Sequence, residues 1–162
     1  SGSGADAMKA FAVSAEAVLL KNTNNANKSE LFYLKDALEQ NDTTAISHIV
    51  SIAKGYRDSA VGLAILPVPA ELAVDDLLLI NSLMRMGEIS TDFTRVNDDP
   101  LATILALQQY PQAVLDLANA FIHIGALYKD AGISFSTGAP GALFVNLIED
   151  MTQKQVSATK KP

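Results

Sequence analysis

The sequence predicts an all-α protein: a single bundle of five to six helices around a long central antiparallel helix pair. Two patterns predict this fold. Apolar residues recur at the three- and four-residue spacing of a helix across residues 70–97 and again across 100–131. Prolines stand where each segment begins, in Leu66-Pro-Val-Pro69 and at Pro100. Because both segments are too apolar to stand alone in water, we expect the rest of the chain to cover their faces.

Composition limits the classes of function. Of the 162 residues, 49% are hydrophobic and 19% charged, below the roughly 25% charged residues of an ordinary soluble domain. The formal net charge of -6 would repel a phosphate backbone, so we expect no nucleic-acid partner. The absence of cysteine excludes disulfides, thiolate metal sites and cysteine nucleophiles. No window approaches the roughly 18 unbroken apolar residues of a membrane span.

The chain is predicted to contain one folded domain, residues 5–153. Residues 1–4 have the sequence Ser-Gly-Ser-Gly, which is typical of a linker or cloning remnant. We therefore expect the natural N-terminus, with any membrane anchor, to lie upstream. Residues 154–162 are polar and are predicted to form a disordered tail.

The first two helices are predicted at residues 5–21 and from Asn27 to near Gln40. An asparagine-rich stretch separates them, and Asn27 with Glu30 forms the pattern of a capping box. The expected buried face of the first helix is Met8, Phe11, Ala15, Val18 and Leu19. That of the second is Leu31, Leu34, Lys35 and Leu38.

A third helix is predicted to begin after Asp42, whose carboxylate can accept hydrogen bonds from the amides that follow. Its apolar positions are Ile46, Ile49, Val50, Ala53, Tyr56, Ala60 and Leu63. The same helix carries a strip of small residues, Ser51, Gly55, Ser59 and Gly62. Glycine destabilises a helix interior by about 1 kcal/mol, so we expect the strip to permit close approach of another backbone.

The fourth helix, 70–97, has two apolar stripes, which predict burial from two sides. One stripe is Leu72, Leu79, Leu83, Met86, Ile89, Phe93 and Val96, and the other is Leu77, Ile80 and Met84. Gly87 is the expected position of a bend.

The fifth helix, 100–131, starts with Asp99 as N-cap and Pro100 in first position. Pro111 predicts a kink or short break near residues 108–111. One expected face is Leu101, Ile104, Leu105, Leu115, Ala118, Ile122 and Gly125, and the other is Leu107, Tyr110, Val114, Leu117, Phe121, Ile124 and Tyr128. After a glycine-rich loop at 138–141, a short last helix is predicted through Leu143, Phe144, Leu147, Ile148 and Met151.

Residues that carry chemistry are few. His48 and His123 are the only histidines, too few for a three-histidine zinc site, and both lie beside apolar residues where histidine usually serves packing. The adjacent acids Asp75 and Asp76 diverge by about 100° on a helix, so they cannot serve one site together. We therefore expect no catalytic residues, no metal and no cofactor. The candidate pocket is Tyr110, Pro111 and His123, because a proline kink leaves a gap between helices.

Four short segments carry a resemblance to a known group of proteins. These are Leu66-Pro-Val-Pro69, Asn97-Asp-Asp-Pro-Leu101, Gln108-Gln-Tyr110 and Ala139-Pro-Gly-Ala-Leu-Phe144. Together they resemble uncharacterised, membrane-anchored, all-helical ectodomains of environmental bacteria with small genomes, over residues 66–147. The resemblance implies a place in the cell envelope and an attached membrane helix. It implies no activity and no site residues.

The leading functional hypothesis is a non-enzymatic, extracytoplasmic interaction or structural module of a bacterial envelope protein. Its expected partner is a protein, and it would meet the membrane only through an anchor outside this chain. The first alternative is a small-molecule sensor or carrier domain with a pocket between the central helices. The second is an enzyme on an unfamiliar helical scaffold, which needs a cleft with a carboxylate or histidine of perturbed pKa.

Overall fold

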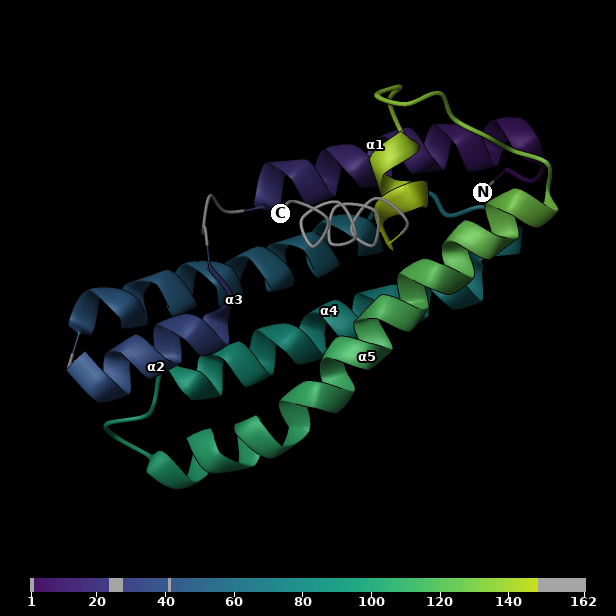
Figure 1. The fold of residues 1–162 in the computed structure, drawn as a ribbon. Coiled ribbons are helices and arrows are strands. Elements are labelled where there is room, and N and C mark those ends of the chain that lie inside the picture. The colour runs from purple at the N-terminus through teal and green to yellow at the C-terminus, as the bar shows by residue number, and fades with distance from the viewer. Residues whose placement is uncertain (1, 24–27, 41, 149–162) are drawn as a thin grey trace, which may run out of the picture.

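The computed structural model describes residues 2–23, 28–40 and 42–148, and it confirms the all-α bundle (Figure 1). The helices are α1 (Ala5–Asn22), α2 (Glu30–Gln40), α3 (Thr43–Ala64), α4 (Ala73–Phe93) and α5 (Pro100–Asp130), with a 3₁₀ turn, η1 (Ala70–Leu72), before α4. Residues 142–148 are also helical. The described residues contain no strand. The predicted tail, 154–162, lies outside them.

The helices form a layered bundle with α4 in the middle. α4 packs against α3 on one side and α5 on the other, and α1 and α2 each pack against α3. Figure 1 shows α5 along the edge of this arrangement and residues 142–148 beside α1. The predicted hairpin of two long helices is therefore present. Only one of its members, however, is central.

The core has two clusters at opposite ends of the layer. One contains Met8, Phe11, Leu63, Leu79, Phe121, Tyr128 and Phe144, among others, and joins α1 and residues 142–148 to the long helices. The other contains Leu34, Ile49, Met86, Phe93 and Ala106, among others, and joins α2 to α3, α4 and the first half of α5.

The start and the buried face of α2 differ from prediction. The helix begins at Glu30, with the Ser29 hydroxyl accepting from the Phe32 amide at 3.4 Å, and Asn27 lies outside the described residues. The buried side chains are Glu30, Tyr33, Leu34 and Ala37. Leu31 and Leu38 are exposed, because α3 covers only one side of this short helix.

The small-residue strip of α3 permits the close helix approach that the sequence predicts. A Cβ atom on Gly55 would lie 2.6 Å from the carbonyl oxygen of Asn22, and one on Gly62 would lie 2.5 Å from Cγ1 of Val18. Contacts this short are impossible for real side chains, so α1 can rest on α3 only where glycine stands. The Asp42 cap is also confirmed, since its side chain accepts from the Thr44 amide at 2.8 Å.

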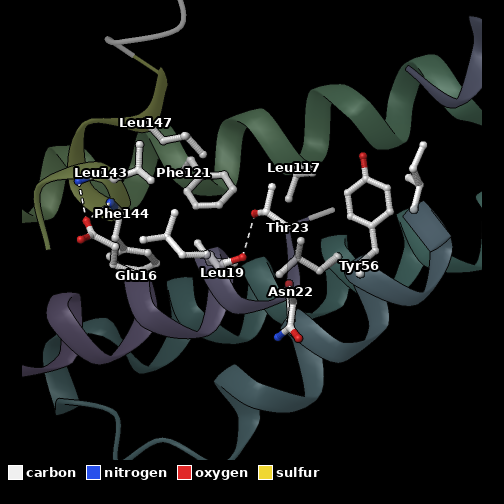
Figure 2. Close-up of a pocket in the computed structure, with 15 residues that line it drawn as sticks. Glu16, Leu19, Asn22, Thr23, Tyr56, Leu117, Phe121, Leu143, Phe144 and Leu147 are labelled. Carbon is white, nitrogen blue, oxygen red and sulfur yellow. Dashed lines mark hydrogen bonds between the residues drawn. The ribbon is translucent and has the colours of Figure 1, made fainter. Parts of the chain in front are cut away.

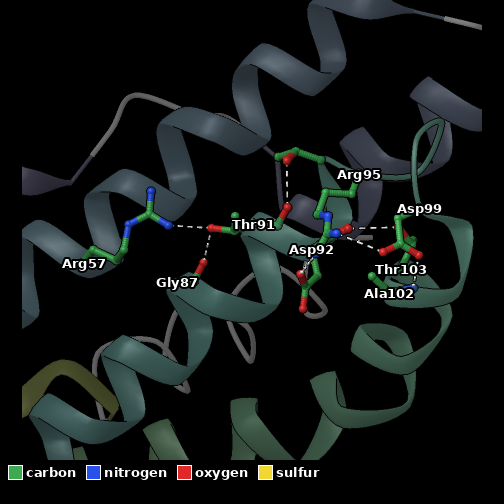
Figure 3. Close-up of polar contacts among 9 residues, drawn as sticks. Arg57, Gly87, Thr91, Asp92, Arg95, Asp99, Ala102 and Thr103 are labelled. Atoms are coloured by element: carbon green, nitrogen blue, oxygen red, sulfur yellow. Dashed lines mark hydrogen bonds and ion pairs between the residues drawn. The ribbon is translucent and has the colours of Figure 1, made fainter.

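The connection from α4 to α5 is held by local polar contacts (Figure 3). α4 ends at Phe93, four residues before the predicted end, and residues 94–98 form turns. Arg95 lies 2.9 Å from Asp99 and 3.4 Å from Asp92. Asp99 also accepts from the Ala102 amide at 3.1 Å, which confirms the predicted N-cap of α5. α5 then continues through Pro111 without a break.

α4 is covered on two sides, by α3 and α5, as the sequence predicts, whereas one predicted face of α5 is not covered. Every member of the main α4 stripe is buried, but Leu77 of the second stripe is 57% exposed. On α5, five large aliphatic side chains of the first predicted face are exposed: Leu101, Ile104, Leu105, Leu115 and Ile122. We call these five residues the outer face of α5. They are exposed because α5 lies at the edge, and its neighbours α4, α1, α2 and residues 142–148 contact its other sides.

Candidate functional site

The three residues predicted to line a pocket lie apart. Tyr110 is half-buried and packs on Phe93, with ring centroids 5.6 Å apart, whereas Pro111 is exposed on α5. His123 follows Tyr110 by 13 residues, about 20 Å along a helix. Its ring is exposed, 3.8 Å from Asp75, and lines a surface hollow between α4 and α5. These residues therefore do not surround one cavity.

Tyr110 instead belongs to a buried polar group centred on Glu30. The Tyr56 hydroxyl donates to Oε1 of Glu30 at 3.2 Å, and Tyr110 lies close enough to the same carboxyl to be influenced by its charge. Glu30 is only 4% exposed. Burial, reinforced by the neighbouring Glu30 carboxyl, raises the pKa of both tyrosines well above the ordinary value of 10. The two hydroxyls are thus kept protonated as donors, and the group joins α2, α3 and α5.

An apolar cavity of about 290 Å³ lies elsewhere, between α1, α3, α5 and residues 142–148 (Figure 2). Its walls are mostly aliphatic and aromatic side chains. The lining residues are Glu16, Leu19, Leu20, Asn22, Thr23, Ile52, Gly55, Tyr56, Ser59, Leu83, Leu117, Phe121, Leu143, Phe144 and Leu147. The volume is close to the lower end of the roughly 300–1,000 Å³ range of small-molecule sites.

Residues 142–148 form one wall of the cavity and are fixed from two sides. Oε2 of Glu16 on α1 accepts from the Leu143 amide at 2.7 Å and from the Phe144 amide at 3.4 Å. On the other side, Gly125 of α5 lies so close to the Val145 carbonyl oxygen that a Cβ there would be 2.9 Å away. The segment therefore bridges α1 and α5 and leaves a cavity beneath it.

Three polar side chains of the cavity wall donate within the protein, whereas the Ser59 hydroxyl, also in the lining, has no hydrogen-bond partner among the described residues. The Thr23 hydroxyl donates to the Leu19 carbonyl at 2.8 Å, Nδ2 of Asn22 donates to the Val18 carbonyl at 3.0 Å, and Tyr56 donates to Glu30. Glu16 brings a carboxylate. Among the described residues of the lining, none is lysine, arginine or histidine. The wall consequently offers mainly acceptors and negative charge.

Asp76 is a buried carboxyl outside the cavity. It is 4% exposed, and its Oδ1 has no hydrogen-bond partner among the described residues. Burial raises the pKa of Asp76 to about 6. Its neighbour Asp75 faces His123 on the other side of the helix turn, as the 100° rotation between adjacent residues requires. Burial, with the neighbouring Asp76 carboxyl, raises the pKa of the Tyr128 hydroxyl, so Asp76 lies near Tyr128 and not in the lining of the cavity.

The two histidines lie on different helices, His48 on α3 and His123 on α5. His48 is exposed and stacks on Tyr33, with ring centroids 4.5 Å apart, and His123 is also exposed. Within the described part of the chain, no three histidine or acidic side chains are grouped as metal ligands. No helix there is long and apolar enough to cross a membrane.

Sequence reasoning missed the cavity because its walls come from five distant segments. The small-residue strip of α3 was the one signal, since it marked where α1 approaches, but it did not show that residues 142–148 would bridge α1 and α5. Comparison with known proteins adds no relative: no family model, curated protein or solved structure matches the chain.

Proposed function

We propose that this chain is a non-enzymatic, extracytoplasmic interaction module of a bacterial envelope protein, and that the outer face of α5 binds a second copy of the chain. The exposed outer face is the observation that carries the proposal. Its five residues span about 33 Å at 1.5 Å per residue, and with a helix width of about 10–12 Å they cover several hundred Å². Exposed apolar patches of this size mark interaction sites in soluble proteins.

Charge and spacing favour a second copy as the partner. Asp116 is the only Asp, Glu, Lys or Arg from Pro100 to Tyr128, so two such faces can meet with little charge to bury. Leu101, Gln108, Leu115 and Ile122 follow one another at seven-residue intervals, the repeat by which helices pair in coiled coils. A face that is the same on both copies suits a two-fold dimer. Its area is below the roughly 800 Å² per partner of a standard interface, so the dimer should dissociate on dilution.

Analytical ultracentrifugation over a concentration series tests this proposal. The native chain should pass from monomer to dimer as concentration rises, and Leu115→Glu should remain monomeric because it buries charge in the contact. The matched control is Val61→Glu, since Val61 is exposed on α3 (60%) and should leave the dimer intact. A native chain that stays monomeric at the highest concentration, or a dimer that Val61→Glu disrupts equally, would contradict the proposal.

The envelope location rests on the resemblance described above and needs its own test. A fusion of the complete natural gene product to alkaline phosphatase, which is active only outside the cytoplasm, should give active enzyme on bacterial cells. An inactive phosphatase fusion, with activity seen only for a fusion to a reporter that works in the cytoplasm, would contradict the envelope location. It would leave the dimer proposal unaffected.

The second candidate function is a carrier or sensor for a small apolar molecule, which the cavity of about 290 Å³ favours. An engineered cavity of about 150 Å³ lined by aliphatic and aromatic side chains stays dry and binds benzene. The cavity here is larger and partly open to solvent, and its apolar wall should bind a larger apolar ligand. Chemical shift changes at the amides of Gly55 and Thr23 on addition of 1-octanol would support this function, and unchanged spectra would contradict it.

A further inference from the structure

We infer that the cavity between α1, α3, α5 and residues 142–148 accepts a single-tailed alkyl amphiphile whose head group donates hydrogen bonds and is neutral or cationic. This inference rests on the second candidate function and names its ligand class. Three features of the cavity carry it: its volume, its apolar wall and the nature of its polar groups.

The volume and the apolar wall of the cavity determine which ligand tail can bind. A water-sized group occupies roughly 30 Å³ in a liquid, so a cavity of about 290 Å³ holds about ten such groups. The wall around the middle of the cavity is aliphatic and aromatic, with Leu19, Leu117 and Phe121 facing one another in Figure 2. An unbranched chain of about eight carbons with a small head group fits this space and this surface.

Polar groups define the head. Asn22, Thr23 and Tyr56 donate to acceptors of the protein, so the Ser59 hydroxyl is the one other side-chain donor in the described lining for a head group that only accepts. Figure 2 shows Glu16 at one end of the cavity, beside Leu143 and Phe144. An alcohol or ammonium can donate to this carboxylate, whereas a ligand carboxylate would be repelled by it.

The amides of Leu143 and Phe144 would otherwise favour an anion. Both donate to Oε2 of Glu16, which therefore already provides the negative charge at the start of the last helical segment. The other oxygen, Oε1, accepts no hydrogen bond from the described residues and can accept one from a ligand. The net charge of -6 acts in the same direction, since it disfavours anions over the whole surface.

Titration of the ¹⁵N-labelled chain with 1-octylamine, 1-octanol and octanoate at pH 7 tests the inference, because these ligands share one tail and differ in the head. We expect shifts at the amides of Gly55, Thr23 and Leu143, and affinity that falls from octylammonium to octanol to octanoate, by about tenfold or more from first to last. Glu16→Gln keeps an acceptor for Leu143 but removes the charge. It should bring the affinities for octylammonium and octanoate to within about threefold and leave that for octanol unchanged.

Controls separate the possible failures. Glu39→Gln makes the same charge change at an exposed site that pairs with Lys35 at 3.9 Å, and should preserve the native order of affinities. Leu117→Trp should fill the cavity and abolish binding of all three ligands while the helical circular dichroism is retained. Equal binding of the three by the native chain, or preference for octanoate, would overturn the head-group inference and leave the carrier function standing. Binding of none, or shifts only at residues remote from the cavity, would overturn both.

Discussion

The sequences of α4 and α5 predict the same kind of long apolar helix, yet the two helices have different neighbours in the fold. Both are long, apolar and marked by helical periodicity. α4 lies between α3 and α5, and its main stripe from Leu72 to Val96 is buried throughout. α5 lies at the edge, buries Phe121, Ile124 and Tyr128 of its other stripe but not Leu107 or Val114, and leaves its outer face in solvent. Periodicity thus identifies a helix and its apolar sides, whereas the arrangement of neighbouring elements decides which of those sides is covered.

The largest expected effect contrasts one leucine on each helix. Leu79 on α4 is 0% exposed and Leu115 on α5 is 56% exposed. Leu79→Ala should lower the free energy of unfolding by about 2–5 kcal/mol, because it removes buried methyl groups and leaves a cavity. Leu115→Ala should change it by less than about 0.5 kcal/mol at concentrations where the chain is monomeric. Chemical denaturation measures both, and similar losses would show that the outer face of α5 is covered after all.

An effect of intermediate size concerns the buried carboxyl of α4. Because the pKa of Asp76 is about 6 in the folded chain and 3.8 ordinarily, the fold favours its protonated form. This contribution to stability is complete below the ordinary pKa of 3.8 and is lost as pH rises through 6, a change of about 3 kcal/mol.

Thermal unfolding between pH 4 and 7 tests this prediction. Asp76→Asn should remove that part of the pH dependence. Asp75→Asn, the matched control, should retain it, because Asp75 faces His123 and solvent. If both variants follow the native pH profile, Asp76 is not the buried titrating group.

The smallest expected effect concerns the start of each helix. α4 follows Leu72 and has no side-chain cap, whereas α5 begins with the Asp99 carboxylate accepting from the Ala102 amide. Asp99→Ala should lower the free energy of unfolding by about 1 kcal/mol. Asp98→Ala, at the exposed position one residue earlier, should lower it by less than about 0.5 kcal/mol. Urea denaturation can resolve the two. Equal losses of stability in the two variants would attribute the effect to negative charge near the helix start rather than to the hydrogen bond of the N-cap.

The sequence predicted the site less well than the fold. The helix starts at Asp42 and Asp99, and the close approach at Gly55 and Gly62, follow from local chemistry and are confirmed. The end of α4 was predicted four residues late: the amides of Thr94, Arg95 and Asp98 donate to carbonyls three residues back, which is the spacing of turns rather than of an α-helix. Tyr110 was predicted to line a pocket because it stands beside Pro111. In the fold it lies near Glu30 on α2, a residue far away in sequence.

The sequence by itself determined that the chain is helical, where most of its helices begin, and which side chains of each helix are apolar. These properties depend on residues within one or two turns of each other, so local order contains them. Only the tertiary structure decided that α4 is central and α5 peripheral, that Asp76 is buried, and that residues 142–148 enclose a cavity with Glu16. Each of these depends on which segments distant in the chain become neighbours, and burial is a property of those neighbours rather than of the helix itself.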